Sequence, residues 1–159
     1  MRSISFVLLI LMLLIGGCSG GSQTKKEIKT MLYDFNEPFR FPFEVNEVRT
    51  EVQVDNIDVI QQFIFHYKNK QTTQEIRYIL SKVINQPEKL SNMGTSRLEL
   101  KTGKVAYYDE DKTSQSIWWE GENGFLARFY YYINGNMEQL DDNNKLQISE
   151  LIELTNQVQ

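Results

Sequence analysis

Two reactive side-chain types occur once each in this sequence, the thiol of Cys18 and the imidazole of His66. An imidazole can act as a general base, but no Ser or Cys nucleophile elbow accompanies it here. Strand alternation predicts that His66 lies opposite Phe65 and Tyr67, on a polar side with Lys68. We therefore expect no catalytic residue and no enzyme; the alternative is a hydrolase that uses His66 as its base.

Acidic runs are the second source of chemistry. The run Asp141–Asn144 supplies the oxygen ligands that calcium prefers, but a calcium loop also needs a glycine at its sixth position. That position is Leu146 when counted from Asp141 and Gln147 when counted from Asp142. Both registers fail, so we expect a solvated acidic loop. The sequence predicts no metal site and no cofactor.

Aromatic residues are the third group of side chains that could form a functional site. Trp118 and Trp119 are adjacent, so on a strand they point to opposite faces and at most one of them faces the core. The other, together with Tyr130 and Tyr132 on a neighbouring strand, would offer amphipathic rings to a ligand or a protein partner. The alternative is that the two tryptophans cover the two faces of a twisted sheet, one of them beneath a terminal helix.

The strongest pattern lies at the start of the chain. Phe6–Ile15 is an uninterrupted run of ten apolar residues that follows Arg2. A spanning helix needs about 20 apolar residues, so this run is too short to cross a bilayer. A positive start, a short apolar core and small residues after it are typical of a secretory signal peptide.

The end of that run, Ile15-Gly16-Gly17-Cys18, resembles the lipobox of bacterial lipoproteins. The resemblance implies cleavage between Gly17 and Cys18 and a diacylglycerol on the Cys18 thiol, with palmitate among its chains. Two acyl chains hold a protein stably at a membrane, whereas one holds it only reversibly. The alternative is an ordinary signal peptide with a stray cysteine.

These features divide the chain into a signal peptide at 1–17, a lipidated cysteine and flexible tether at 18–26, and a single domain at 27–159. The formal charge of −4 becomes more negative when Arg2 is removed with the signal peptide. Nucleic-acid binders carry clustered Lys and Arg, so we expect no nucleic-acid partner.

Alternation of apolar and polar residues predicts the elements of this domain. Strands are expected near 48–54, 59–67, 75–84, 116–120 and 125–133, with a hairpin at 95–100 and 104–108 that turns at Gly103. Ser149 is the expected N-cap of a terminal helix. The prediction is an α+β domain, an antiparallel sheet of about six to eight strands with a C-terminal helix packed on it.

An aromatic arm precedes the sheet. Phe39, Phe41 and Phe43 alternate between Pro38 and Pro42, which confines the stretch to an edge or an extended arm. Either the arm packs on the core of its own domain, or it exposes an aromatic patch to a partner or to lipid.

Three segments of the second half carry a family resemblance: residues 98–108, the run 117–120 followed by Asn123-Gly124, and residues 148–156. Together they resemble the uncharacterised extracytoplasmic domain of Gram-positive lipoproteins and of the outer portions of some anti-sigma factors. The resemblance spans roughly 43–158, and the aromatic arm and the 134–144 loop depart from it. It implies a location and an architecture but no catalytic residues.

The sequence thus predicts a lipid-anchored protein on the extracytoplasmic face of the cell membrane, held there through Cys18. We expect a non-enzymatic binding or regulatory domain whose partner is an envelope protein or a small apolar ligand. The alternative is a lipid- or glycan-binding carrier with a sheet-lined cavity.

Overall fold

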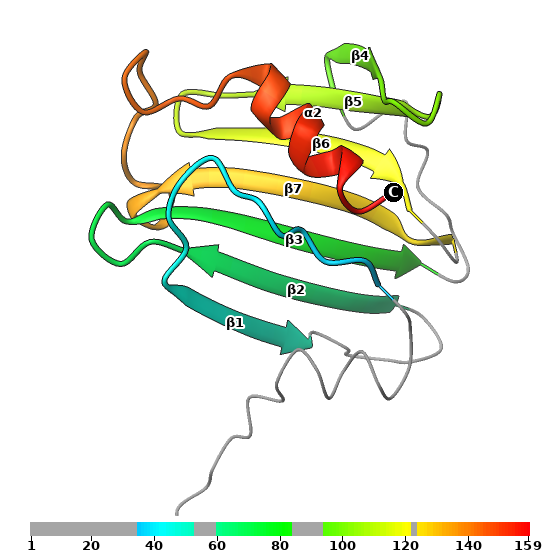
Figure 1. Ribbon diagram of the computed structural model, residues 1–159, viewed down its shortest axis with the longest axis horizontal. Coiled ribbons are helices and arrows are strands. Elements are labelled where there is room, and N and C mark those ends of the chain that lie inside the picture. The colour runs from blue at the N-terminus through cyan, green and yellow to red at the C-terminus, as the bar shows by residue number, and fades with distance from the viewer. Residues whose placement is uncertain (1–34, 53–59, 84–93, 122–123) are drawn as a thin grey trace, which may run out of the picture.

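A computed structural model describes residues 35–52, 60–83, 94–121 and 124–159 (Figure 1). The predicted signal peptide, the Cys18 lipidation site and the tether lie outside these residues. No helix within the described ranges is long and apolar enough to cross a membrane.

Seven strands form one antiparallel sheet in the order β1-β2-β3-β7-β6-β5-β4 (Figure 1). The chain builds β1, β2 and β3 as neighbours, starts again at the far edge with β4, and returns until β7 pairs with β3. The strands are β1 (Glu47–Val52), β2 (Ile60–Lys68), β3 (Gln74–Val83), β4 (Ser96–Glu99), β5 (Val105–Glu110), β6 (Ser114–Glu120) and β7 (Leu126–Ile133). A 3-10 turn, η3 (Asn134–Asn136), and one helix, α2 (Ile148–Asn156), follow.

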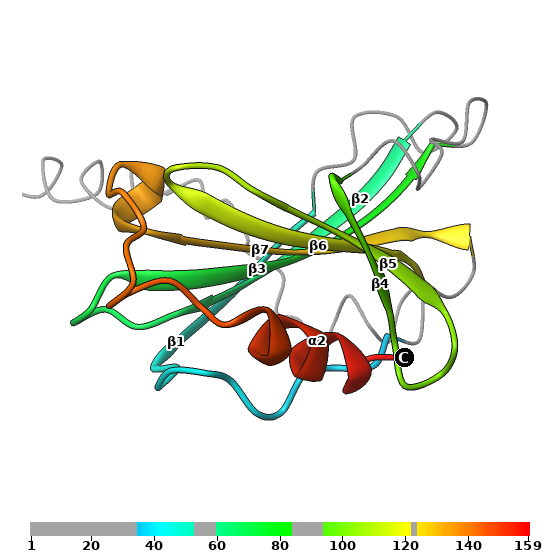
Figure 2. The same cartoon turned by 90° about the horizontal axis from the view of Figure 1, so that it is seen from above.

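The prediction of an antiparallel sheet with a C-terminal helix is confirmed, although the described chain is mostly sheet. The hairpin between β4 and β5 turns at Gly103, whose φ of 79° lies in the left-handed region that glycine adopts without strain. Strand alternation gives the sheet two different faces. We call the side covered by α2 and by residues 35–46 the inner face, and the opposite side the outer face (Figure 2).

The inner face carries the core. Its buried residues line up across the strands in the observed register, which brings aromatic rings of β2, β3, β7 and β6 together. Tyr78 and Phe129 have ring centroids 4.8 Å apart, and Trp119 and Phe129 have theirs 5.1 Å apart. The strand residues of this core are Phe63, Phe65, Tyr67, Ile76, Tyr78, Leu80, Ala106, Tyr108, Ile117, Trp119, Ala127, Phe129, Tyr131 and Ile133.

Helix α2 closes the inner face with Leu151 and Leu154, both buried in this core. The prediction that Ser149 caps the helix is wrong, because the N-cap is Gln147, two residues earlier, and the helix begins at Ile148. The Glu150 carboxylate accepts a hydrogen bond of 2.8 Å from the Gln147 backbone N–H. Glu150 thereby accepts from a backbone N–H that has no partner within the helix. Ser149 lies inside the first turn and does not cap the helix.

The aromatic arm, residues 35–46, crosses the inner face beside α2 (Figures 1 and 2). The Phe41 ring lies 4.6 Å from that of Tyr67, and the Phe43 ring lies 6.2 Å from that of Tyr131. Phe39, in contrast, is 77% exposed. Of the two alternatives for the arm, packing on its own core therefore describes Phe41 and Phe43, and exposure describes Phe39.

Buried Gln115 of β6 fastens the segment that leads into α2. Its amide nitrogen donates to the Leu146 carbonyl and its amide oxygen accepts from the Leu146 N–H, each at 2.9 Å. These paired bonds satisfy a buried amide and hold the start of the helix against the sheet.

Candidate functional site

The outer face carries a continuous row of stacked side chains. The Arg128 guanidinium of β7 lies 4.2 Å from the ring of Trp118 and 4.3 Å from the ring of Tyr130. The rings of Tyr130 and Tyr132 are 5.3 Å apart, and the guanidinium of Arg77 on β3 lies 4.9 Å from that of Tyr132. We call these five residues the aromatic–arginine row.

Strand register explains why the row is continuous. Trp118 is directly opposite Arg128 across the β6–β7 pair, and Arg77 is directly opposite Tyr130 across the β3–β7 pair. Cations over aromatic faces contribute about 0.5–1 kcal/mol at exposed sites and about 2 kcal/mol when desolvated. Burial lowers the pKa of Arg128, and within the described part of the chain its buried Nε has no hydrogen-bond partner. Ring faces therefore provide its main contacts.

The row ends at a buried carboxylate. Glu75 of β3 accepts hydrogen bonds from His66 Nδ1 at 2.7 Å and from Arg77 Nε at 3.0 Å. Burial alone would raise the pKa of the Glu75 carboxyl, but hydrogen bonds from partners including His66 and Arg77 outweigh it and lower the pKa to about 2. Glu75 is therefore ionised at neutral pH. Burial and this carboxylate together raise the pKa of the neighbouring Tyr132 hydroxyl.

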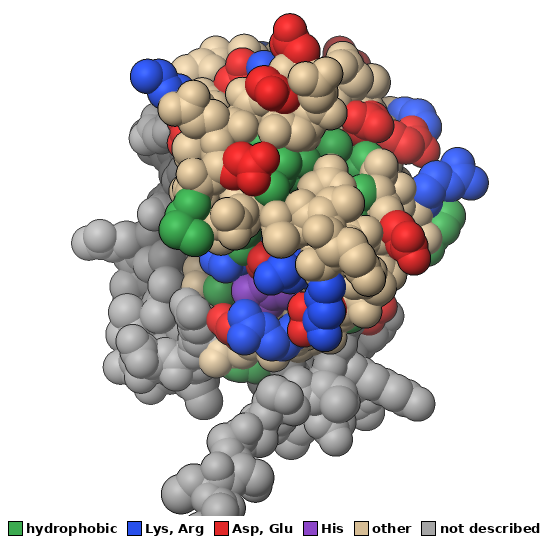
Figure 3. Space-filling model, turned by 90° about the vertical axis from the view of Figure 1, so that its left-hand side faces the viewer, with side chains coloured by type: hydrophobic (Ala, Val, Ile, Leu, Met, Phe, Trp, Pro, Cys, Tyr) green, Lys and Arg blue, Asp and Glu red, His purple; other side chains and the backbone are tan. Residues whose placement is uncertain are grey.

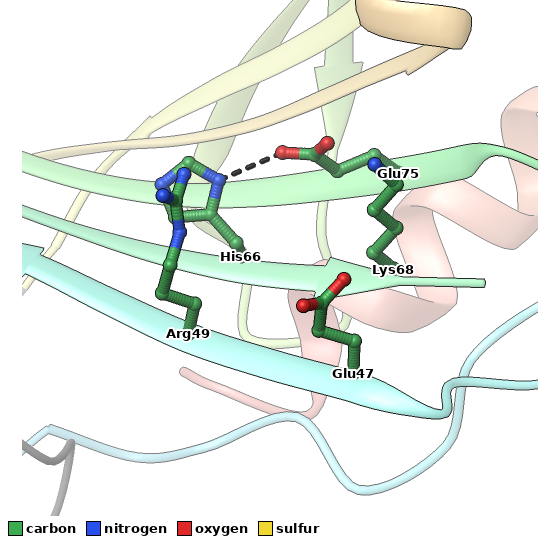
Figure 4. A pocket seen from close by; sticks show the side chains of 5 residues that line it. All are labelled: Glu47, Arg49, His66, Lys68 and Glu75. Atoms are coloured by element: carbon green, nitrogen blue, oxygen red, sulfur yellow. Dashed lines mark hydrogen bonds and ion pairs between the residues drawn. The ribbon is translucent and has the colours of Figure 1, made fainter. Parts of the chain in front are cut away.

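A polar cleft of about 220 Å³ opens over this carboxylate, which we call the His66 cleft. Its lining residues come from three strands and project to the same side of the sheet (Figure 4). They are Glu47 and Arg49 of β1, His66 and Lys68 of β2, and Glu75 of β3. Figure 3 shows the one histidine of the chain set among Lys, Arg and carboxylate side chains.

His66 is the buried centre of this cleft, with 4% of its surface exposed. Its Nδ1 is bonded to Glu75, whereas its buried Nε2 has no hydrogen-bond partner. Glu51 Oε1 lies 3.5 Å from Nε2, and the same oxygen is bound by Arg49 Nη2 at 2.7 Å. An unsatisfied buried polar atom is costly, so Nε2 is the least satisfied polar atom among the side chains of this cleft.

The structure brings together three of the four predicted surface residues, Trp118, Tyr130 and Tyr132. It excludes the fourth, because Trp119 is 1% exposed and stacks on Tyr78 in the core, 5.9 Å between ring centroids. The two tryptophans thus point to opposite faces of β6, as alternation predicted. Tyr132 is itself 1% exposed, so its ring supports the row from within and offers little surface to a ligand.

Sequence reasoning placed His66 on the side of β2 that carries Lys68, and this is correct. It missed the burial of the imidazole and the two carboxylates beside its ring, Glu75 at Nδ1 and Glu51 at Nε2. The signal that could have found Glu75 is the spacing of the β2–β3 hairpin. Its register sets Lys68 opposite Glu75 and His66 opposite Arg77, so that the His66–Glu75 contact is diagonal.

The acidic run Asp141–Asn144 forms a turn closed on itself. Asp141 Oδ1 accepts hydrogen bonds from the backbone N–H of Asn143 at 2.9 Å and of Asn144 at 3.2 Å. Among the residues that the structure describes, no group of three or more His, Cys, Asp or Glu side chains is arranged to hold a metal ion.

The site and fold define an antiparallel β-sheet protein with one face closed by a helix and an arm, and a polar cleft on the other face. The chain matches no protein-family model, and it has no significant match among curated proteins or among solved structures. The resemblance to lipoprotein domains therefore stays an expectation drawn from the sequence.

Proposed function

We propose that this protein is a lipoprotein held by Cys18 on the extracytoplasmic face of a cell membrane, where it acts as a non-enzymatic binding or regulatory domain. The Ile15–Cys18 segment supports the anchor, and the outer face supports binding. In this proposal residues 27–159 form one extracytoplasmic α+β domain.

The observation that carries the binding function is the His66 cleft. Its side chains are held in place by charge-assisted hydrogen bonds to Glu75, which gives a preorganised polar surface. Catalysis by His66 has less support, because no Ser, Thr or Cys of the described ranges is hydrogen-bonded to Nε2.

The carrier alternative has less support than surface binding. A carrier needs an apolar cavity, yet the inner face is filled by contacting rings of Tyr78, Trp119 and Phe129. Arm residue Phe35 adds to this packing, with ring centroids 5.4 Å from those of Phe63 and of Phe125.

The anchor is tested by growing a bacterial host that expresses the full chain with labelled palmitate. The wild-type chain and the neighbouring control Ser19→Ala should carry label and partition into detergent. Cys18→Ser should carry none and should keep its first 17 residues, as intact-mass measurement would show. An unlabelled wild-type chain would overturn the anchor.

The non-enzymatic assignment is tested separately with the purified lipoprotein in detergent micelles. Incubation with envelope extracts should leave the composition of the extract unchanged. Turnover of an envelope component that disappears in His66→Ala would replace binding with catalysis.

A further inference from the structure

We propose that two copies of this chain bind each other through the groove between the arm and α2, with Phe39 of each copy inserted into the groove of the other. This surface lies on the side of the sheet that α2 covers, opposite to the His66 cleft. Three observations support the contact: an exposed ring on an ordered backbone, the position of that ring at one end of a groove, and the charges along the groove.

The groove between the arm and α2, which we call the arm–helix groove, has a volume of about 290 Å³. This lies just below the range of about 300–1,000 Å³ that is typical of pockets for whole small molecules, so it suits one large side chain. Two of its arm residues, Phe41 and Pro42, are apolar and half-buried, which favours an apolar occupant. Its other lining residues are Arg40, Ser149, Glu150, Glu153 and Gln157.

Phe39 is an exposed ring on an ordered backbone. It is 77% exposed, yet its backbone N–H donates to the Gln157 side chain at 3.0 Å, as that of Arg40 does at 2.9 Å. The next ring along the arm, Phe41, is fixed against Tyr67. Transfer of an exposed ring from water to an apolar site is favourable, and an ordered backbone loses little conformational freedom on binding. Phe39 is therefore suited to insertion into a second molecule.

The arm runs antiparallel to α2 along the arm–helix groove (Figures 1 and 2). Gln157 fixes Arg40 beside the end of the helix. Further along the arm, the Phe43 ring lies 6.2 Å from that of Tyr131, whose hydroxyl donates to the Asn144 carbonyl shortly before the helix begins. The exposed ring thus lies where the helix ends, and the later arm residues lie where the helix begins.

A two-fold axis across the middle of the arm–helix groove exchanges its two ends. Phe39 of each copy then lies over the other end of the opposite groove, beside Pro42 and Ser149. Because the ring and the groove are neighbours on one surface, the contact closes on itself and every interaction occurs twice, as in an isologous dimer. A ring and a groove on distant surfaces would instead build an open chain of molecules.

The charges along the groove are compatible with this pairing. Arg40 follows Phe39 in the arm, and Glu150 lies in the first turn of the helix at the other end of the groove. The two-fold axis therefore brings Arg40 of one copy toward Glu150 of the other. Glu153 lies near the axis, where it approaches its own equivalent, but Lys101 Nζ binds its carboxylate at 2.7 Å and offsets the charge.

The proposed contact is small. Stable interfaces bury about 1,200–2,000 Å², whereas this one consists of one ring and one groove from each copy. We therefore expect weak association between dilute chains and stronger pairing where copies are held close together. The anchor at Cys18 would hold them so by raising their effective concentration at the membrane, and this step rests on the proposed function.

Site-specific photocross-linking in membranes of a bacterial host that expresses the full chain tests the contact. Ser149→p-benzoylphenylalanine places a probe at an exposed position in the groove. Irradiation should give a product of twice the chain mass, and fragment mass spectrometry should join position 149 to the segment that contains Phe39. The control Gln139→p-benzoylphenylalanine probes an exposed loop outside the groove and should give no such product.

Phe39→Ala in the chain that carries the probe should lower the yield of this product about fivefold or more, as expected for a residue at the centre of an interface. Phe39→Trp keeps a large ring and should retain the product. Met137→Ala is the matched control, because Met137 is also 77% exposed but does not line the groove. Unchanged urea midpoints in all three variants would show that the fold is intact.

Three outcomes would overturn the inference: no product of doubled mass, a product that joins position 149 to lipid or to a different envelope protein, or a yield that Phe39→Ala leaves unchanged. Palmitate labelling separates this inference from the anchor. A labelled chain that gives no doubled product loses the pairing alone, and an unlabelled chain that still gives it loses the anchor alone.

Discussion

At the scale of single residues, Glu75 organises the outer face. One carboxylate oxygen accepts from both His66 and Arg77, and it joins the His66 cleft to the aromatic–arginine row. Loss of either partner would strongly destabilise the fold, because the cost of removing the Glu75 carboxylate from water is offset only by well-placed hydrogen-bond donors. The arrangement therefore links the stability of the fold to the ionisation of one group.

Glu75 gives the folded protein a distinct acid sensitivity. Its pKa is lowered from 4.5 to about 2, so its contribution to stability is complete above pH ~4.5 and is lost as the pH falls toward 2. At 1.36 kcal/mol per pH unit this contribution is on the order of 3 kcal/mol. Glu75→Gln should lower the free energy of unfolding at pH 7 by about 1–3 kcal/mol, and the difference from wild type should vanish near pH 2.

Urea titrations at pH 7, 4.5 and 2.5 check this prediction. Acids elsewhere, such as Glu110 and Asp111, also have lowered pKa values and contribute equally to both proteins, so the difference isolates Glu75. The exposed control Glu99→Gln should track wild type at every pH. A gap between wild type and Glu75→Gln that stays constant with pH would show that packing, and not ionisation, carries the effect.

Alternation in the sequence determined which face each of these residues occupies, but it could not determine their partners. His66 was placed beside Lys68 correctly because a side chain's face depends only on its own strand. The contacts of His66 with Glu75 and Glu51 depend on the registers of β1, β2 and β3, which are set across strands. Likewise, only packing against Tyr78 shows which of Trp118 and Trp119 is buried.

At the scale of elements, the aromatic arm is attached to the end of α2 by one side chain. Gln157 accepts hydrogen bonds from the backbone N–H of Phe39 at 3.0 Å and of Arg40 at 2.9 Å, and it donates to the Arg40 carbonyl at 3.0 Å. A single amide thus joins two segments that lie at opposite ends of the described chain. Neither segment predicts the contact alone, which is why sequence reasoning left the position of the arm open.

Removal of this amide should loosen the arm and spare the sheet. Gln157→Ala should lower the free energy of unfolding by about 1–2 kcal/mol, since three hydrogen bonds to exposed backbone groups are lost. Hydrogen exchange should accelerate in peptides that cover residues 39–41. The control Gln139→Ala changes an exposed loop amide and should alter neither quantity. Unchanged exchange at 39–41 would show that ring packing by Phe41 suffices to hold the arm.

The boundaries of strands and helices could be predicted from the sequence where they depend on one residue or on close neighbours in the chain. Gly103 was identified as a turn because its backbone needs a positive φ, which few other residues adopt. The N-cap was misplaced by two residues because serine is a common N-cap residue, whereas glutamine, the residue at Gln147, is not. The Gln147–Glu150 bond and the contacts of Gln115 with Leu146 decide the boundary instead, and the second of these is a tertiary contact.

At the scale of the whole molecule, a single core joins the arm, the sheet and the helix. Phe35, Trp119 and Leu151 belong to one cluster of buried side chains, although they come from the arm, the sheet and the helix respectively. A domain with one continuous core is expected to unfold as a unit. We therefore expect the sheet to be unstable without the helix.

Leu151→Ala tests this cooperativity. Leu151 is fully buried, and truncation of a buried leucine costs about 2–5 kcal/mol. Because one core connects the layers, the urea midpoint should fall equally when followed by tryptophan fluorescence, which reports β6, and by hydrogen exchange in α2. The control Ile148→Ala alters a helix residue that is 41% exposed, and it should shift the free energy of unfolding by no more than about 0.5 kcal/mol. Loss of exchange protection in α2 with an unchanged fluorescence midpoint would mean that the sheet stands without its helix.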